Sequence, residues 1–193
     1  MENKLLQNIE KIRFTYLPEK IQLLLVGEAP PDASDRFFYY PNVKTNDWLF
    51  LAILKALSGE KCYQKYIKYR KTVNDVSPIK SKYLNILKEN GIYLMDLSSY
   101  PAGEVLPESQ ISTFLKSVED LTHEGNIDKS TPIVLIKANV YDCLYSTLNR
   151  KGYNVLNARL PFPSCGQQTN FNVKFLETLK NNKINTTIKM EIL

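Results

Sequence analysis

Carboxylates gather in the stretch that follows the first apolar run of the chain. Glu28 comes directly after this run, and Asp32 and Asp35 follow within a few residues. Four consecutive aromatic residues occupy positions 37–40. Carboxylates that converge on one site act as general acids or bases, or stabilise positive charge that develops in a reaction. The residue types and their spacing predict a functional site within residues 27–41.

A strand and a tight turn must position these acids. Residues 21–26 form an apolar run that does not alternate, as expected for a strand covered on both faces. Gly27 allows a turn that a Cβ would obstruct, and Pro30 and Pro31 prevent further ladder hydrogen bonds. In open α/β sheets the ligand crevice lies outside the carboxyl ends of the strands, which is where this loop falls.

The rest of the chain alternates helix and strand patterns. Periodicity and capping signals predict helices over residues 2–14, 47–59, 77–90, 107–122, 140–150 and 170–181. Apolar runs predict further strands over residues 92–97, 133–136 and 153–156, and the tail at 188–193 is a candidate edge strand. The alternation predicts one α/β domain over residues 1–193. We expect a three-layer α/β/α sandwich with a central, mostly parallel four-stranded sheet.

Three loops are then expected to share the edge at which the strands end, namely residues 27–41, 96–101 and 159–168. None of them has the glycine pattern of a phosphate loop or a dinucleotide fold, and no Gly-x-Ser-x-Gly elbow is present. The sequence therefore argues against the commonest α/β chemistries.

Composition is that of an intracellular globular protein. The 193 residues suit one domain, and 44% hydrophobic with 23% charged residues is ordinary. The net charge of +5 is compatible with a polyanionic partner. Cys62, Cys143 and Cys165 form no Cys-x-x-Cys pair, so we expect a cytoplasmic protein without a metal or cofactor. No apolar run approaches a membrane span, and we expect a monomer that does not bind membranes.

Residues 60–76 interleave basic and aromatic side chains. One interpretation is a surface helix whose long cationic side chains reach water. The other is a surface that meets phosphates with its cations and bases with its rings. The sequence leaves both interpretations open.

Three motifs, in order along the chain, resemble those of the uracil-DNA glycosylase superfamily. Residues 26–30 (Val-Gly-Glu-Ala-Pro) resemble the first motif of its Gly-Glu-Ala-Pro branches. Asp96 ends the second strand, where those enzymes commonly carry an asparagine that reads the base. Residues 162–164 (Phe-Pro-Ser) match their His-Pro-Ser loop except at the first position. The resemblance covers residues 20–180 and implies a protein that removes a deaminated or damaged base from DNA after rotating it out of the stack.

The same resemblance assigns roles to individual residues. Ala29 stands where the best-known branch has its water-activating aspartate, so we expect Asp32 or Asp35 to take that role. Phe37 or Phe38 falls where the family has a ring that stacks on the extracted base. We expect catalysis to involve Glu28, Asp32 and Asp35. We expect the base to contact Gly27, Ala29, Phe37, Phe38, Asp96, Phe162 and Ser164. We expect DNA to contact Lys137, Arg159, Pro163 and Gln167.

Two departures from the family pattern leave a second hypothesis open. Phe162 cannot donate the hydrogen bond that the family's histidine gives to a uracil oxygen, and an ionised Asp96 offers only acceptors. The protein is then either a glycosylase acting on uracil or a related base, or a catalytically inactive module of the same fold that binds a nucleobase or nucleic acid. The chain also lacks the four cysteines with which some Gly-Glu-Ala-Pro branches hold an iron–sulfur cluster.

Structural roles are the competing interpretation for these residues. Glu28 and Asp96 can bond nearby backbone amides at their turns, and the aromatic residues at 37–40 can belong to the core. The only histidine, His123, has no partner at catalytic spacing and is expected on the surface.

Overall fold

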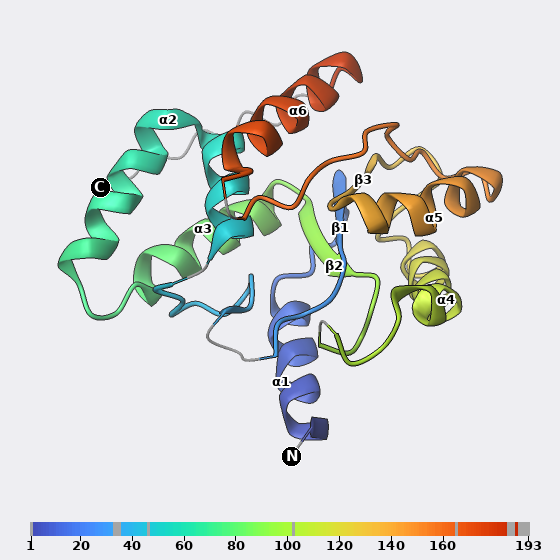
Figure 1. Cartoon of the computed structure of the whole chain (residues 1–193), viewed down its shortest axis with the longest axis horizontal. Helices are drawn as coiled ribbons and strands as arrows, with labels where there is room; N and C mark the ends of the chain where they lie inside the picture. Colours follow the sequence, from blue (N-terminus) through green and yellow to red (C-terminus); the bar gives the residue numbers. More distant parts are fainter. Residues whose placement is uncertain are drawn as a thin grey trace.

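The computed structural model describes residues 2–32, 36–45, 47–101, 103–164, 166–184 and 188. It is a mostly helical α/β protein with a small, all-parallel sheet (Figure 1). The strands are β1 (Leu23–Gly27), β2 (Ile92–Asp96) and β3 (Ile133–Leu135). The helices are α1 (Glu2–Thr15), α2 (Trp48–Thr72), α3 (Ser77–Glu89), the 3-10 helix η2 (Pro107–Gln110), α4 (Ile111–His123), α5 (Ala138–Arg150) and α6 (Gln168–Asn181).

The first apolar run forms the central strand. The order is β2-β1-β3, and β1 is buried at every residue. In Figure 1, α4 and α5 lie to the right of the sheet, while α2, α3 and α6 lie to its left. Helices on both sides explain why the run does not alternate. The register pairs Gly27 with Asp96, so β1 and β2 end at the same level and their loops leave together.

The sheet has three strands in the described part of the chain, where the sequence predicts four. Residues 153–160 make only two isolated bridges, between Val155 and Ile133 and between Leu160 and Ile136. A tight local turn lies between the two bridges, and in it Ala158 N donates to Leu156 O at 2.8 Å. Of the candidate edge strand at 188–193, only Ile188 lies among the described residues, and its N donates to Leu57 O of α2.

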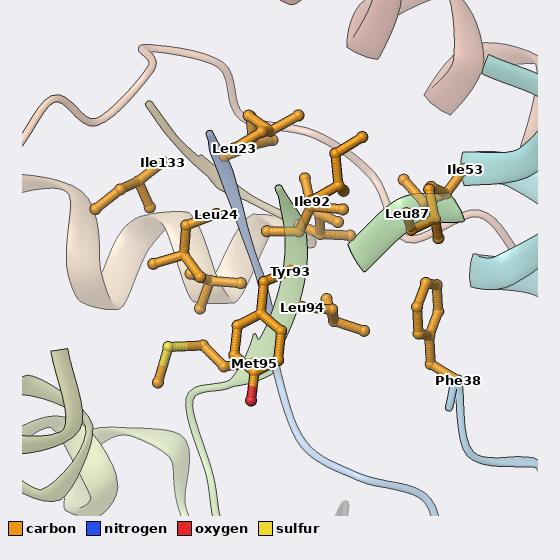
Figure 2. Packing of buried hydrophobic residues seen from close by; sticks show 14 of the residues in the cluster. Leu23, Leu24, Phe38, Ile53, Leu87, Ile92, Tyr93, Leu94, Met95 and Ile133 are labelled. Atoms are coloured by element: carbon orange, nitrogen blue, oxygen red, sulfur yellow. The ribbon is translucent and has the colours of Figure 1, made fainter. Parts of the chain in front are cut away.

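Apolar side chains of the sheet and its covering helices form the core. Figure 2 shows Leu24 of β1 on the same side as Ile133, Leu23 on the other side of the strand, and Leu94 of β2 facing Phe38 and Leu87. Tyr39 fixes the aromatic loop to the free edge of β2. Its hydroxyl accepts from Leu94 N at 2.7 Å and donates to Leu94 O at 3.1 Å. The loop that carries the predicted site is therefore anchored to the strand that carries Asp96.

Helix α2 kinks at Gly59, whose φ of 81° is in the left-handed region that glycine adopts readily. Beyond the kink, Tyr66 is buried and packs edge-on against Phe50 and Tyr83. Lysines 61, 65, 68 and 71 are exposed. The basic and aromatic segment thus forms a surface helix whose buried ring points inward. No helix in the described part of the chain is long and apolar enough to cross a bilayer.

Candidate functional site

A cavity of about 380 Å³ opens at the carboxyl ends of β1 and β2. The parallel register brings the two strand ends together, and the bridge between Ile136 and Leu160 carries the late loop to the same edge. Most of the residues singled out in the sequence lie around this cavity. Its wall includes Gly27, Glu28, Ala29, Asp32, Phe37, Phe38, Asp96, Lys137 and Phe162.

Both carboxylate oxygens of Glu28 are occupied. One forms an ion pair with Nζ of Lys137, and the other accepts a hydrogen bond from Nδ2 of Asn139. Both partners lie where β3 leads into α5, so the carboxylate sits at the N-terminus of that helix and gains from its dipole. The side chain of Glu28 is 21% exposed and that of Lys137 is 40% exposed, so the pair is reached from the cavity.

Lys137 has an unusual backbone. Its φ of 86° and ψ of 138° are rare for a residue with a Cβ, and such conformations cost roughly 1–3 kcal/mol. The residue also lies immediately before α5 and contacts Glu28 across the cavity wall. A strained residue that contributes a charge to a cavity is typical of a functional site.

Asp96 is held by Arg13, a residue that no pattern in the sequence pointed to. Nη2 of Arg13, from α1, lies 2.7 Å from Oδ2 of Asp96, and their side chains are only 15% and 7% exposed. Burial raises the pKa of Asp96; the Arg13 guanidinium opposes this shift and the nearby Glu28 carboxylate adds to it. The acid is therefore a buried pocket residue rather than a solvated turn residue.

The most exposed rings of the cavity are not the two that were expected to stack on the base. Phe37 and Phe38 are 2% and 6% exposed and pack edge-on against Tyr39, so they belong largely to the core. Phe162 and Trp48 are 36% and 38% exposed and also line the cavity. A planar ligand would therefore meet the rings of Phe162 and Trp48 most readily.

Most of the other predicted residues lie apart from the cavity wall. Arg159 is engaged by Asp142 through two hydrogen bonds of 2.9 and 2.7 Å. The backbone carbonyl of Ser164 accepts a hydrogen bond from the backbone N–H of Gln167 in a local turn, and Pro163 is buried. Asp32 lines the cavity but pairs with Arg36 and is well exposed. Asp35 and Cys165 lie outside the described residues.

A buried ion pair supports the wall beside Trp48. Nζ of Lys80 lies 2.7 Å from Oδ2 of Asp47, and both side chains are almost fully buried. Burial raises the pKa of Asp47 to about 6, while the Lys80 ammonium works against that shift. The ammonium also lies 4.6 Å from the centre of the Phe50 ring. Asp47 lines the cavity, so this pair fixes the start of α2 against it.

Sequence reasoning missed Arg13, Asn139, Trp48 and Asp47. Asn139 comes three residues after Ile136, the last residue of the third predicted strand. The rule that selects polar residues at strand ends would therefore have found it. No local signal connects Arg13 with Asp96, because 83 positions separate them.

In the described residues, no group of three or more histidine, cysteine, aspartate or glutamate side chains is placed to hold a metal ion. No protein-family model, curated protein or solved structure significantly matches the chain.

Proposed function

We propose that the protein is a DNA N-glycosylase of the uracil-DNA glycosylase type, with the three-layer fold of that superfamily. It would hydrolyse the N-glycosidic bond of a deaminated or damaged base that has been rotated out of the duplex. The observation that carries the proposal is the convergence of Glu28, Asp96 and Lys137 on one cavity with exposed rings. The volume of about 380 Å³ falls in the ~300–1,000 Å³ range of small-ligand sites.

The charges of the site suit the reaction. Cleavage leaves positive charge on the sugar and negative charge on the departing base. The site therefore needs a negatively charged carboxylate for the sugar and a positively charged hydrogen-bond donor for the base. Glu28 supplies the carboxylate, and the ammonium of Lys137 supplies the donor that Phe162 cannot provide. Asp32 or Asp35 would activate the water. Asp96, with its acceptor oxygens, would read amino or imino hydrogens on the base.

A single-turnover excision assay tests this proposal. Labelled oligonucleotides carry uracil, hypoxanthine or xanthine, and alkali converts abasic sites into strand breaks. We expect breaks with the wild type, and Glu28→Gln should slow their formation about 100-fold or more. Glu177→Gln is the matched control, since Glu177 is exposed on α6. Absence of breaks on every oligonucleotide, or an unchanged rate in Glu28→Gln, would contradict the proposal.

A binding module of the same fold is the second candidate. It is favoured by the full occupation of the Glu28 carboxylate, which leaves neither oxygen free. Trp48 is the only tryptophan of the chain and lines the cavity, so its fluorescence reports ligand entry. Fluorescence changes with oligonucleotides, without excision by excess protein, would favour this candidate.

A further inference from the structure

The side chains of Lys137, Glu28 and Asn139 form a hydrogen-bonded chain beside the cavity. Nζ of Lys137 contacts Oε2 of Glu28, and Nδ2 of Asn139 donates to Oε1 of the same carboxylate. The three come from two elements, with Glu28 after β1 and the other two at the start of α5. Lys137 and Glu28 both line the cavity.

This arrangement differs from the exposed ion pairs of the molecule. The pair of Lys151 and Glu119, 2.9 Å apart, has side chains 43% and 45% exposed. Glu28 is about half as exposed, is bonded to a third residue and faces a cavity. A nucleophile within hydrogen-bond reach of a proton acceptor, with the acceptor oriented by a third group, is an arrangement used in covalent catalysis.

We propose that Lys137 is a nucleophile that forms an imine with the aldehyde of an abasic deoxyribose in DNA, with Glu28 as its proton acceptor. The site would then also cut the strand beside the abasic sugar by β-elimination. This activity rests on the proposed function, because it places the sugar left by base removal in the same cavity. Its substrate, however, can be supplied without any base removal.

The first half of the reaction makes the imine. Glu28 takes a proton from the Lys137 ammonium, and the freed amine attacks C1′ of the ring-opened sugar. A C–N bond forms while the carbonyl electron pair moves to oxygen. That oxygen takes one proton from the attacking nitrogen and a second from Glu28, and it leaves as water, which gives the protonated imine and restores the Glu28 carboxylate. Asn139 keeps the carboxylate in place throughout, because it bonds the oxygen that does not face Lys137.

The second half breaks the strand. The protonated imine makes the C2′ hydrogen acidic, and Glu28 removes it as a proton. The C–H electron pair becomes the C2′=C3′ bond, and the C3′–O bond breaks with the phosphate as leaving group. Water then hydrolyses the imine, which restores the amine and releases the unsaturated aldehyde. The step consumes no oxidant or reductant.

Reductive trapping on preformed abasic DNA tests the proposal. An oligonucleotide whose abasic aldehyde is unmasked by photolysis is incubated with the full chain and sodium cyanoborohydride, which reduces the imine to a stable amine. We expect a covalent protein–DNA adduct, and peptide mass spectrometry should place it on Lys137. Lys137→Arg keeps the positive charge but provides no amine, so it should reduce adduct yield at least 10-fold.

Lys151→Arg is the matched control and should trap like the wild type, because Lys151 lies on the surface beyond the end of α5. Circular dichroism confirms that each variant is folded. An adduct on other lysines, equal trapping by Lys137→Arg, or no adduct would overturn the proposal. Trapping on Lys137 without base excision would leave it standing and refute the glycosylase; excision without trapping would do the reverse.

Discussion

The carboxylate of Asp96 occupies the space that a side chain on Gly27 would need. A Cβ at Gly27 would lie 2.7 Å from Oδ1 of Asp96, closer than real Cβ atoms approach other atoms. The two residues are direct partners in the register of β1 and β2. Glycine at this position therefore lets a buried acid lie beside the turn that carries Glu28.

Gly27→Ala should lower the free energy of unfolding by about 1–3 kcal/mol, the usual cost of overpacking. Asp96 cannot simply rotate away, because Arg13 holds its other oxygen. Urea denaturation measures the cost, and the same substitution in an Asp96→Ala background provides the control. The cost should shrink there because the clashing atom is gone; equal costs in both backgrounds would show that this contact does not limit the position.

Tyr39→Phe should destabilise the protein by about 1–3 kcal/mol. The substitution removes the hydroxyl that bonds both backbone groups of Leu94 and leaves them buried without a partner. Hydrogen exchange measured by NMR should show faster exchange of the Leu94 amide than in the wild type. Tyr145→Phe on α5 is a control without such a backbone bond among the described contacts. Unchanged Leu94 exchange would mean that the hydroxyl does not protect the strand edge.

Lys80→Met should cost about 3–5 kcal/mol near pH 8, because Asp47 is left as a buried, unpaired charge. Burial already raises the pKa of Asp47 to about 6 in the wild type, and loss of Lys80 removes an opposing influence. An acid with a raised folded-state pKa binds more protons in the folded state, so stability falls as pH rises from about 4 to above 6.

The double variant Lys80→Met, Asp47→Asn isolates this effect, since it has no carboxylate at the site. Urea denaturation between pH 4 and pH 8 should show the decline in Lys80→Met and its absence in the double variant. Parallel pH profiles for the two variants would contradict the assignment to Asp47.

Phe162→His should raise the rate of uracil excision if the proposed reaction is correct. Phe162 lines the cavity, and a histidine there adds a hydrogen-bond donor for the departing base. One such donor contributes about 100- to 1000-fold in related chemistry, so a gain of about 10-fold or more is expected in a single-turnover assay. Phe162→Leu is the control, because it removes the phenyl ring without adding a hydrogen-bond donor. An equal excision rate in Phe162→His and Phe162→Leu would exclude a role for the histidine donor.

The elements of the fold follow largely from local pattern. The helix expected over 77–90 is α3 (Ser77–Glu89), and the strand expected over 92–97 is β2 (Ile92–Asp96). The strand expected over 153–156 failed for a physical reason. Its apolar residues are buried. However, β3 is only three residues long, and within residues 153–156 only Val155 forms a bridge to it, at Ile133. An apolar run reveals burial, not whether a neighbouring backbone is available for a ladder.

The site was predictable where it depends on strand ends. Glu28 and Asp96 were selected because they end apolar runs, and the parallel register brings them to one cavity. The partners that set their chemistry were not predictable in the same way. Arg13 reaches Asp96 from α1, 83 positions away in the sequence, and only packing decides that the two meet.

Direct detection of the free base tests the proposed function most closely. Wild type and Glu28→Gln, each in excess over oligonucleotides carrying uracil, hypoxanthine or xanthine, are incubated and the small molecules analysed by mass spectrometry. The account predicts one free base released in proportion to abasic sites by the wild type, with a loss of about 100-fold in Glu28→Gln. Changes in Trp48 fluorescence that show DNA in the cavity, with no free base released, would contradict it.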